Sequence, residues 1–232
     1  MLVLGHRGAS ADAPENAPEA FALADEMGAD GVELDVRRAA DGRLLVAHDP
    51  LPDEIDALEL ATLAEVLDAC GDRMLVNIEI KNWKDDAGYD PTMAMVEPIV
   101  EELRRRGPRA SGRWLISSFS WSTVAAVRDV APQIATGCLT SAPVAEATLD
   151  RLAVLGHAAL HPREPLVDAE LVANCHERGM TVNTWTCNDA DRLVALAQLG
   201  VDGVCTDVPD VAMAALGRTG ANGAPTWPNA TP

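Results

Sequence analysis

Short apolar runs alternate along the chain with segments whose apolar residues recur at helical spacing. The runs predict strands at Leu2–Gly5, Gly31–Val36, Met74–Lys81, Trp114–Phe119, Ala135–Thr140, Ala158–His161, Thr181–Thr186 and Gly203–Asp207. The helical spacing predicts helices at Pro18–Met27, Leu63–Ala69, Met93–Arg106, Ser122–Val130, Ala145–Leu155, Asp168–Arg178, Ala190–Leu199 and Val211–Leu216.

The residues between these segments support eight β/α units. Thr62 followed by Glu65 predicts a capping box, and the Asp-Gly pair at 41–42 predicts a short extra hairpin after the second strand. At about 27 residues per unit, the chain fits a single-domain α/β fold, the (β/α)8 TIM barrel, over residues 1–217. The alternative, an open doubly wound sheet, usually carries a glycine-rich nucleotide loop, and the sequence has none. Residues 218–232 lack periodicity and predict a flexible C-terminal tail.

The composition narrows the classes of partner. The formal net charge is −18, which argues against binding to nucleic acid and against stable association with anionic membranes. The five cysteines form no CxxC pair and are expected to be reduced packing residues. The first residues lack a basic segment before a long apolar stretch, so we expect neither a signal peptide nor a membrane span, and a cytoplasmic location. The sequence does not predict an oligomeric state.

Polar side chains gather at the ends of the predicted strands, where a barrel builds its active face. Because side chains alternate along a strand, Glu33 and Asp35 share one face of the second strand, and Glu79 and Lys81 share one face of the third. An exposed edge strand could carry such acids, but both faces of a barrel strand are covered, and an unpaired buried carboxylate costs several kcal/mol. Three oxygen ligands without cysteine favour one hard divalent cation, Mg²⁺ or Ca²⁺. Lys81 could hold a phosphoryl oxygen or pair with Glu79.

Two histidines also lie at the ends of predicted strands. His6 follows the first strand and His48 follows Leu44–Ala47; a lone histidine is commonly structural, but a pair can serve as acid and base at a phosphodiester. Arg7 could bind its phosphate. His161 is a weaker candidate for substrate contact, and Trp185 could form a wall for an apolar or polyol substrate.

The motifs taken together resemble the glycerophosphodiester phosphodiesterase family from Gly5 to about Pro209. They are GHRGAS at 5–10, PEN at 14–16, ELDV at 33–36, HD at 48–49, NIEIK at 77–81, SSFS at 117–120, NTWTCN at 183–188 and GVDGVCTDVPD at 200–210. The resemblance implies a barrel that hydrolyses glycerophosphodiesters to glycerol 3-phosphate and an alcohol with a divalent metal, Mn²⁺ being a further possibility. It also implies functional roles for individual residues: His6 and His48 as the acid/base pair, Glu33, Asp35 and Glu79 as metal ligands, Arg7 and Lys81 as phosphate-binding cations, Phe119 and Trp185 as substrate walls, and Asp207 as a support for Arg7 or a ligand.

Two departures from the family pattern concern capping and specificity. Ala17 stands where the family usually has Thr, and the segment between Asp49 and Leu60 is shorter than in many relatives.

An alternative function is that of a phospholipase D-like or lysophospholipid-cleaving relative, which would need an apolar lip around the site. A non-catalytic binding barrel is disfavoured because both histidines and all three carboxylates are present.

Overall fold

The computed structural model describes residues 1–52, 60–86, 88–107, 112–220 and 227. Its strands are β1 (Leu2–His6), β2 (Gly31–Arg38), β3 (Leu44–Val46), β4 (Leu75–Ile80), β5 (Trp114–Ser118), β6 (Ala135–Thr140), β7 (Ala159–Pro162), β8 (Thr181–Thr184) and β9 (Gly203–Thr206). Its α-helices are α1 (Pro18–Glu26), α2 (Leu63–Ala69), α3 (Val96–Arg105), α4 (Trp121–Val130), α5 (Glu146–Val154), α6 (Ala169–Glu177), α7 (Ala190–Gln198) and α8 (Pro209–Ala215), with a 3₁₀ turn at Glu164–Leu166.

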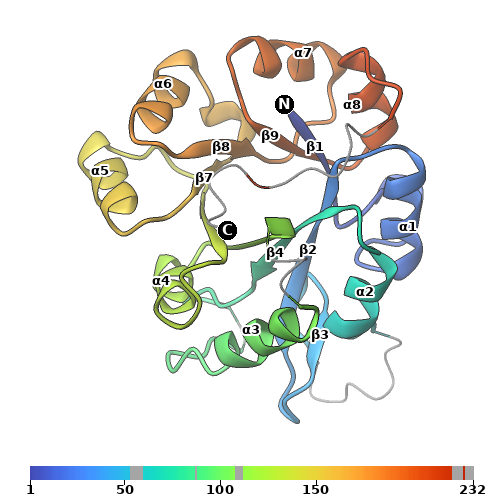
Figure 1. The fold of residues 1–232 in the computed structure, drawn as a ribbon, viewed down its shortest axis with the longest axis vertical. Helices are drawn as coiled ribbons and strands as arrows, with labels where there is room; N and C mark the ends of the chain where they lie inside the picture. Colours follow the sequence, from blue (N-terminus) through green and yellow to red (C-terminus); the bar gives the residue numbers. More distant parts are fainter. Residues whose placement is uncertain (53–59, 87, 108–111, 221–226, 228–232) are drawn as a thin grey trace.

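The parallel strands close into a ring. Neighbours follow in the order β1, β9, β8, β7, β6, β5, β4, β2, and β1 pairs with β2 to complete the circle. β3 lies outside this ring, antiparallel to β2, and the helices follow one another around the strands (Figure 1). The structure confirms the (β/α)8 barrel and the extra hairpin that the sequence predicts.

Local sequence signals explain some helix bounds and not others. Thr62 and Glu65 form the predicted capping box at the start of α2, whereas Ala17 begins α1 without a side-chain cap. The prediction of a helix from Met93 to Arg106 is wrong at its start, because Met93 has a φ of +58°. The Asp90 carboxylate accepts from the backbone N–H groups of Thr92 and Ala94, so residues 90–95 form turns before α3 begins at Val96.

The barrel interior divides into an apolar end and a polar end. At the amino-terminal ends of the strands, a buried cluster contains Leu4, Leu75, Leu115 and Ala135. At the carboxyl ends the inward residues are acids, histidines and amides, among them Glu33, Asp35, Asn77, Glu79 and His161. This division is typical of a TIM barrel, whose stability comes from one end and whose chemistry comes from the other.

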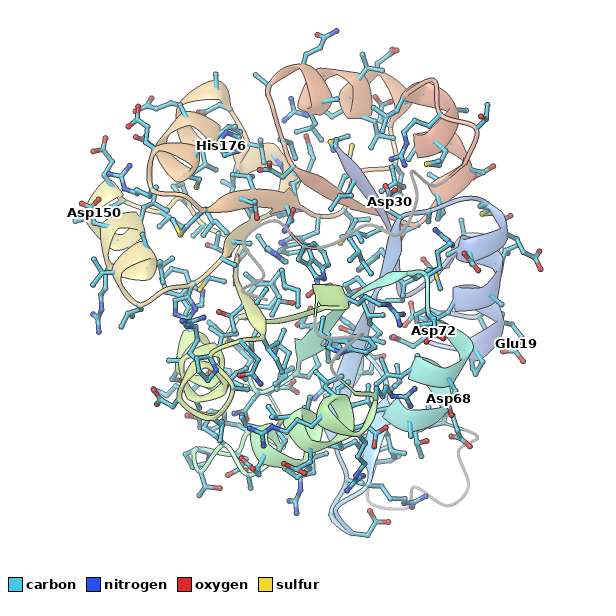
Figure 2. All side chains as sticks on the ribbon, viewed as in Figure 1. Glu19, Asp30, Asp68, Asp72, Asp150 and His176 are labelled. Atoms are coloured by element: carbon cyan, nitrogen blue, oxygen red, sulfur yellow. The ribbon has the colours of Figure 1, made fainter. Side chains whose placement is uncertain are left out.

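Two residues of the predicted tail pack against the barrel. Arg218 forms a bidentate ion pair with the buried Asp30, with both N–O distances 2.6 Å; Figure 2 labels Asp30 beside β1. Trp227 is 2% exposed, belongs to the apolar cluster with Leu4, and donates its indole N–H to the Arg113 carbonyl at 2.9 Å. The expectation of a flexible terminus is therefore wrong for Arg218 and Trp227, while the domain boundary at 217/218 stays a prediction.

The acidic surface lies on the outer helices. Figure 2 shows Glu19, Asp68 and Asp150 on α1, α2 and α5, away from the strands. All five cysteines are free and buried, as the sequence predicts. Among the described residues, none of the helices has the length and apolar composition needed to cross a bilayer. The cytoplasmic location stays a prediction.

Removing the Trp227 side chain should destabilise the barrel. We expect Trp227→Ala to lower the free energy of unfolding by about 3–5 kcal/mol, because it empties a buried site and leaves the Arg113 carbonyl without its donor. Urea denaturation measures the change. Val154→Ala, at a residue that is 87% exposed, is the control and should change the free energy by less than about 0.5 kcal/mol. Equal midpoints for Trp227→Ala and the unmodified chain would show that Trp227 contributes nothing to stability.

Candidate active site

A strained turn after β1 fixes the first part of the site. Arg7 has a φ of +57° and Gly8 has a φ of +87°, a region that side chains with a Cβ rarely adopt. A Cβ on Gly8 would lie 2.5 Å from the backbone carbon of Ala20, so only glycine fits there. The turn brings the backbone N–H of Arg7 to the Glu33 carboxylate at 3.1 Å. It therefore holds His6, Arg7 and Glu33 at the mouth of the barrel.

Three carboxylates meet at the carboxyl ends of β2 and β4. Parallel pairing sets Asp35 beside Glu79, and Glu33 lies two residues before Asp35 on the same face. One oxygen from each of Glu33, Asp35 and Glu79 lies within 4.8 Å of the others. Their exposed fractions are 4%, 1% and 8%. This all-oxygen, buried group suits a hard divalent cation.

The acids differ in how easily they ionise. Burial and the charge of Asp35 raise the pKa of Glu33 to about 8. Burial also raises the pKa of Glu79 to about 7, although Lys81 opposes it. Asp35 is equally buried, but Lys81, Asn16 and Arg7 hold its pKa below the usual range. With all three acids ionised, the cluster would thus carry more negative charge than its neighbours stabilise.

Two cationic side chains contact the acids. The Lys81 ammonium lies 2.9 Å from Asp35 and 2.8 Å from Glu79, so it makes the ion pair that the sequence left open and a second one besides. Arg7 Nε lies 3.2 Å from Asp35, and its Nη1 lies 2.8 Å from Glu15. Among the described residues, no cationic side chain lies within ion-pair distance of Glu33. The Glu33 carboxylate accepts a hydrogen bond from the Arg7 backbone N–H.

His6 is held by Asp207. His6 Nδ1 and Asp207 Oδ1 lie 2.6 Å apart, and Ser10 and Asn188 also donate to the same carboxylate, at 3.1 and 2.6 Å. Burial would lower the pKa of His6, but the hydrogen bond to Asp207 and the negative charges of Glu33 and Asp207 together outweigh it, and the pKa is raised. The same bond lowers the pKa of Asp207 to about 2. Asp207 was expected to support Arg7 or a metal ligand; instead it supports His6, because the turn directs Arg7 toward Asp35 and Glu15.

His48 approaches from the hairpin side of the site. Arg37 donates from Nε and Nη2 to the His48 carbonyl at 2.9 and 2.7 Å, and His48 Nδ1 lies 2.9 Å from Asp49. Arg37 therefore fixes the backbone at the point where the chain leaves β3. Most of the short segment after Asp49, residues 53–59, lies outside the described residues.

One cavity of about 70 Å³ joins the two histidines, Arg7, Lys81, Glu33 and Glu79. Its walls include Phe119 and Trp185, whose rings meet edge to face with centroids 5.3 Å apart. His161 lines the same cavity. Burial lowers the pKa of His161 to about 3, so its ring is neutral, and Nε2 lies 3.1 Å from the Asn183 amide nitrogen. The cavity therefore contains every side chain that the sequence proposed for substrate contact.

Sequence reasoning missed three residues around the site. Asn16, with a φ of +60°, donates from its side-chain amide to Asp35 at 2.9 Å and accepts from the Asp35 backbone N–H at 3.2 Å. Arg37 and Trp83 belong to the outer side of the site. The PEN motif marks Asn16, and the scarcity of aromatic residues could have marked Trp83.

Comparison with known proteins identifies the same family. The model of the glycerophosphoryl diester phosphodiesterase family matches residues 6–59 and 51–211. A glycerophosphodiester phosphodiesterase of Caldanaerobacter subterraneus subsp. tengcongensis is 32% identical, over 90% of this chain and 95% of the relative.

Solved structures agree with this match. A phosphodiesterase of Oleispira antarctica in complex with the product sn-glycerol-3-phosphate has a TM-score of 0.83 and 26% identity, covering 94% of this chain and 97% of that one. A glycerophosphodiester phosphodiesterase of Thermotoga maritima has a TM-score of 0.75 and 26% identity, covering 91% and 96%. The family model, the barrel and the clustered site residues thus lead to one conclusion: the chain belongs to the glycerophosphoryl diester phosphodiesterase family.

Proposed function

We propose that this enzyme hydrolyses glycerophosphodiesters to glycerol 3-phosphate and an alcohol, with one divalent cation and with His6 and His48 as general acid and base. The observation that carries the proposal is a single cavity that both histidines line together with Arg7, Lys81 and two of the three clustered carboxylates.

Glu33, Asp35 and Glu79 would hold the cation, which we propose to be Mg²⁺ or Ca²⁺, with Mn²⁺ as a further possibility. Three carboxylates carry three negative charges when ionised, and the two neighbouring cations, Arg7 and Lys81, offset only two of them. Glu33 in particular, whose pKa burial raises to about 8, needs a further positive charge to stay ionised at neutral pH. When bound, a divalent cation supplies positive charge that polarises a phosphoryl oxygen.

Arg7 and Lys81 would bind the substrate's phosphate. The net charge of −18 repels an anionic ester at long range, so attraction must come from these local cations and the metal. Both line the cavity, and both are anchored to carboxylates, which keeps the side chains in place before the substrate arrives. Cations fixed in this way stabilise the charge that shifts onto the phosphoryl oxygens and the leaving oxygen as the ester bond breaks.

The two histidines would move the protons. Asp207 holds Nδ1 of His6, so Nε2 is the atom left to exchange a proton with the substrate or with water. Asp49 lies against Nδ1 of His48 in the same manner. One histidine removes a proton from the nucleophile and the other protonates the departing alkoxide. The neutral His161, Phe119 and Trp185 would complete the wall against the glycerol part.

Loss of either histidine should abolish most turnover. We expect His6→Ala and His48→Ala each to lower kcat by about 10²–10⁴-fold, because each removes one proton transfer. Hydrolysis of glycerophosphocholine, followed by release of glycerol 3-phosphate, measures the effect. His176→Ala, at a surface histidine on α6 paired with Asp202, is the matched control. Activity near that of the control in either variant would remove that histidine from the mechanism.

Asp207→Asn should change the pH dependence as well as the rate. Asp207 raises the pKa of His6, so its neutral replacement should lower that pKa and move the His6-dependent limb of the kcat profile to lower pH, with kcat reduced on the order of 10²-fold. A merely structural loss would reduce kcat without moving the limb. Asp210→Asn on α8 is the control and should leave the profile unchanged. An unmoved limb in Asp207→Asn would contradict the role of Asp207.

Removing the divalent cation should abolish turnover, and substituting one of the metal-binding acids should weaken metal binding. We expect EDTA to remove turnover and Mg²⁺, Mn²⁺ or Ca²⁺ to restore it, while Glu79→Gln needs far more metal for half-maximal activity because it loses one charged ligand. Glu19→Gln on α1 is the matched control. Full turnover after thorough chelation would contradict the proposed cation.

A further inference from the structure

A second cavity adjoins the first on its outer side. It is open, has a volume of about 380 Å³, and shares His48, Glu79, Lys81 and Phe119 with the inner cavity of about 70 Å³. The proposed function assigns Lys81 to the ester's phosphate, His48 to proton transfer and Glu79 to the cation, and it places Phe119 in the wall beside them. A diester whose phosphate lies among them therefore has one substituent in each cavity.

The sizes of the two cavities distinguish the substituents. The inner one is small and its floor is made of fixed, buried side chains such as Asn77 and His161, which suits the glycerol part that every substrate of the proposed reaction carries. The outer one is larger and open, which suits the alcohol that differs from one substrate to another. The side chains that line the outer cavity therefore influence which alcohol the enzyme accepts.

Trp83 is the prominent side chain of the outer cavity. It is 48% exposed, in a chain with five Trp, two Phe and one Tyr. Its ring meets Phe119 at a centroid distance of 6.1 Å and an angle of 78°, and Phe119 in turn meets Trp185. The row of perpendicular rings supports Trp83 from one side, and Trp83 lines the cavity while about half of it stays exposed.

Charges around the outer cavity favour a cation. Arg37 is neutralised by Asp86, at an N–O distance of 2.7 Å, and Lys81 by the two carboxylates that it contacts. The side chain of Asp49, in contrast, is 90% exposed and has His48 as its partner. An aromatic ring and an exposed carboxylate that line the same cavity together attract a quaternary ammonium group, through the ring quadrupole and the negative charge.

We propose that the outer cavity binds the cationic headgroup of a glycerophosphodiester, a quaternary ammonium alcohol such as choline, against the ring of Trp83. The inference rests on the proposed function, because it assumes that the phosphate lies among the shared residues. It assigns Trp83 to headgroup binding and leaves the bond-breaking residues unchanged.

Steady-state kinetics on two substrates test the assignment. Glycerophosphocholine carries a cationic headgroup, and glycerophosphoinositol carries a neutral polyol of larger size. We expect Trp83→Ala to raise KM for glycerophosphocholine by about 2- to 30-fold, the range of a cation–π contact, with kcat and the glycerophosphoinositol constants nearly unchanged. Trp83→Phe, which keeps a ring, should restore most of the affinity. Leu155→Ala, at a residue directly after α5 that has the same exposed fraction of 48% and does not line the outer cavity, is the matched control.

Product inhibition gives an independent measure of which cavity is affected. Glycerol 3-phosphate should inhibit Trp83→Ala as well as it inhibits the unmodified enzyme, because it lies in the inner cavity, whereas inhibition by choline should weaken. Thermal melting confirms that the variant is folded.

The outcomes separate this inference from the proposed function. Unchanged KM for glycerophosphocholine in Trp83→Ala, or an equal rise for both substrates, would overturn the inference and leave the proposed function standing. Failure of the unmodified, metal-loaded enzyme to hydrolyse either substrate would overturn the proposed function and the inference with it.

Discussion

Three carboxylates lie within 4.8 Å of one another inside the barrel, and their mutual repulsion is the constraint to which the rest of the site responds. Taking each charge out of water costs several kcal/mol before repulsion is counted. Lys81 bridges two of the acids, Asn16 and Arg7 contact the one between, and a backbone N–H reaches Glu33. These contacts leave Glu33 and Glu79 with raised pKa values, so the arrangement favours a further positive charge.

The barrel tolerates the free-energy cost of these buried charges because its apolar, stabilising side chains and its active site lie at opposite ends. Its amino-terminal end is closed by apolar side chains around Leu4, including Trp227 from the C-terminal segment. Its carboxyl end holds the acids, the two histidines and the aromatic walls. The outer acids, such as Asp68 and Asp150 (Figure 2), set a repulsive field for phosphate esters, so recognition depends on short-range contacts at the mouth. An enzyme built in this way gains selectivity from the cavity walls, which can vary without disturbing the acids.

Sequence periodicity was enough to predict the barrel and the shared face of Glu33 and Asp35, because alternation along a strand is a local property. It was also enough for the α2 cap, where Thr62 and Glu65 are three residues apart. Contacts between distant segments could not be predicted: Asp207 lies 201 residues from His6, and Trp227 lies 114 residues from Arg113. The late start of α3 depends on the positive φ of Met93, which propensity does not favour. The role of Asn16 depends on tertiary geometry in the same way.

Anomalous diffraction from crystals of the full chain grown with Mn²⁺ would test the central claim most directly, since it locates a cation independently of turnover. The account predicts a peak among the carboxylate oxygens of Glu33, Asp35 and Glu79, with Lys81 displaced from at least one of them. A peak confined to other parts of the chain, or a site without a peak in which Lys81 still bridges Asp35 and Glu79, would contradict it.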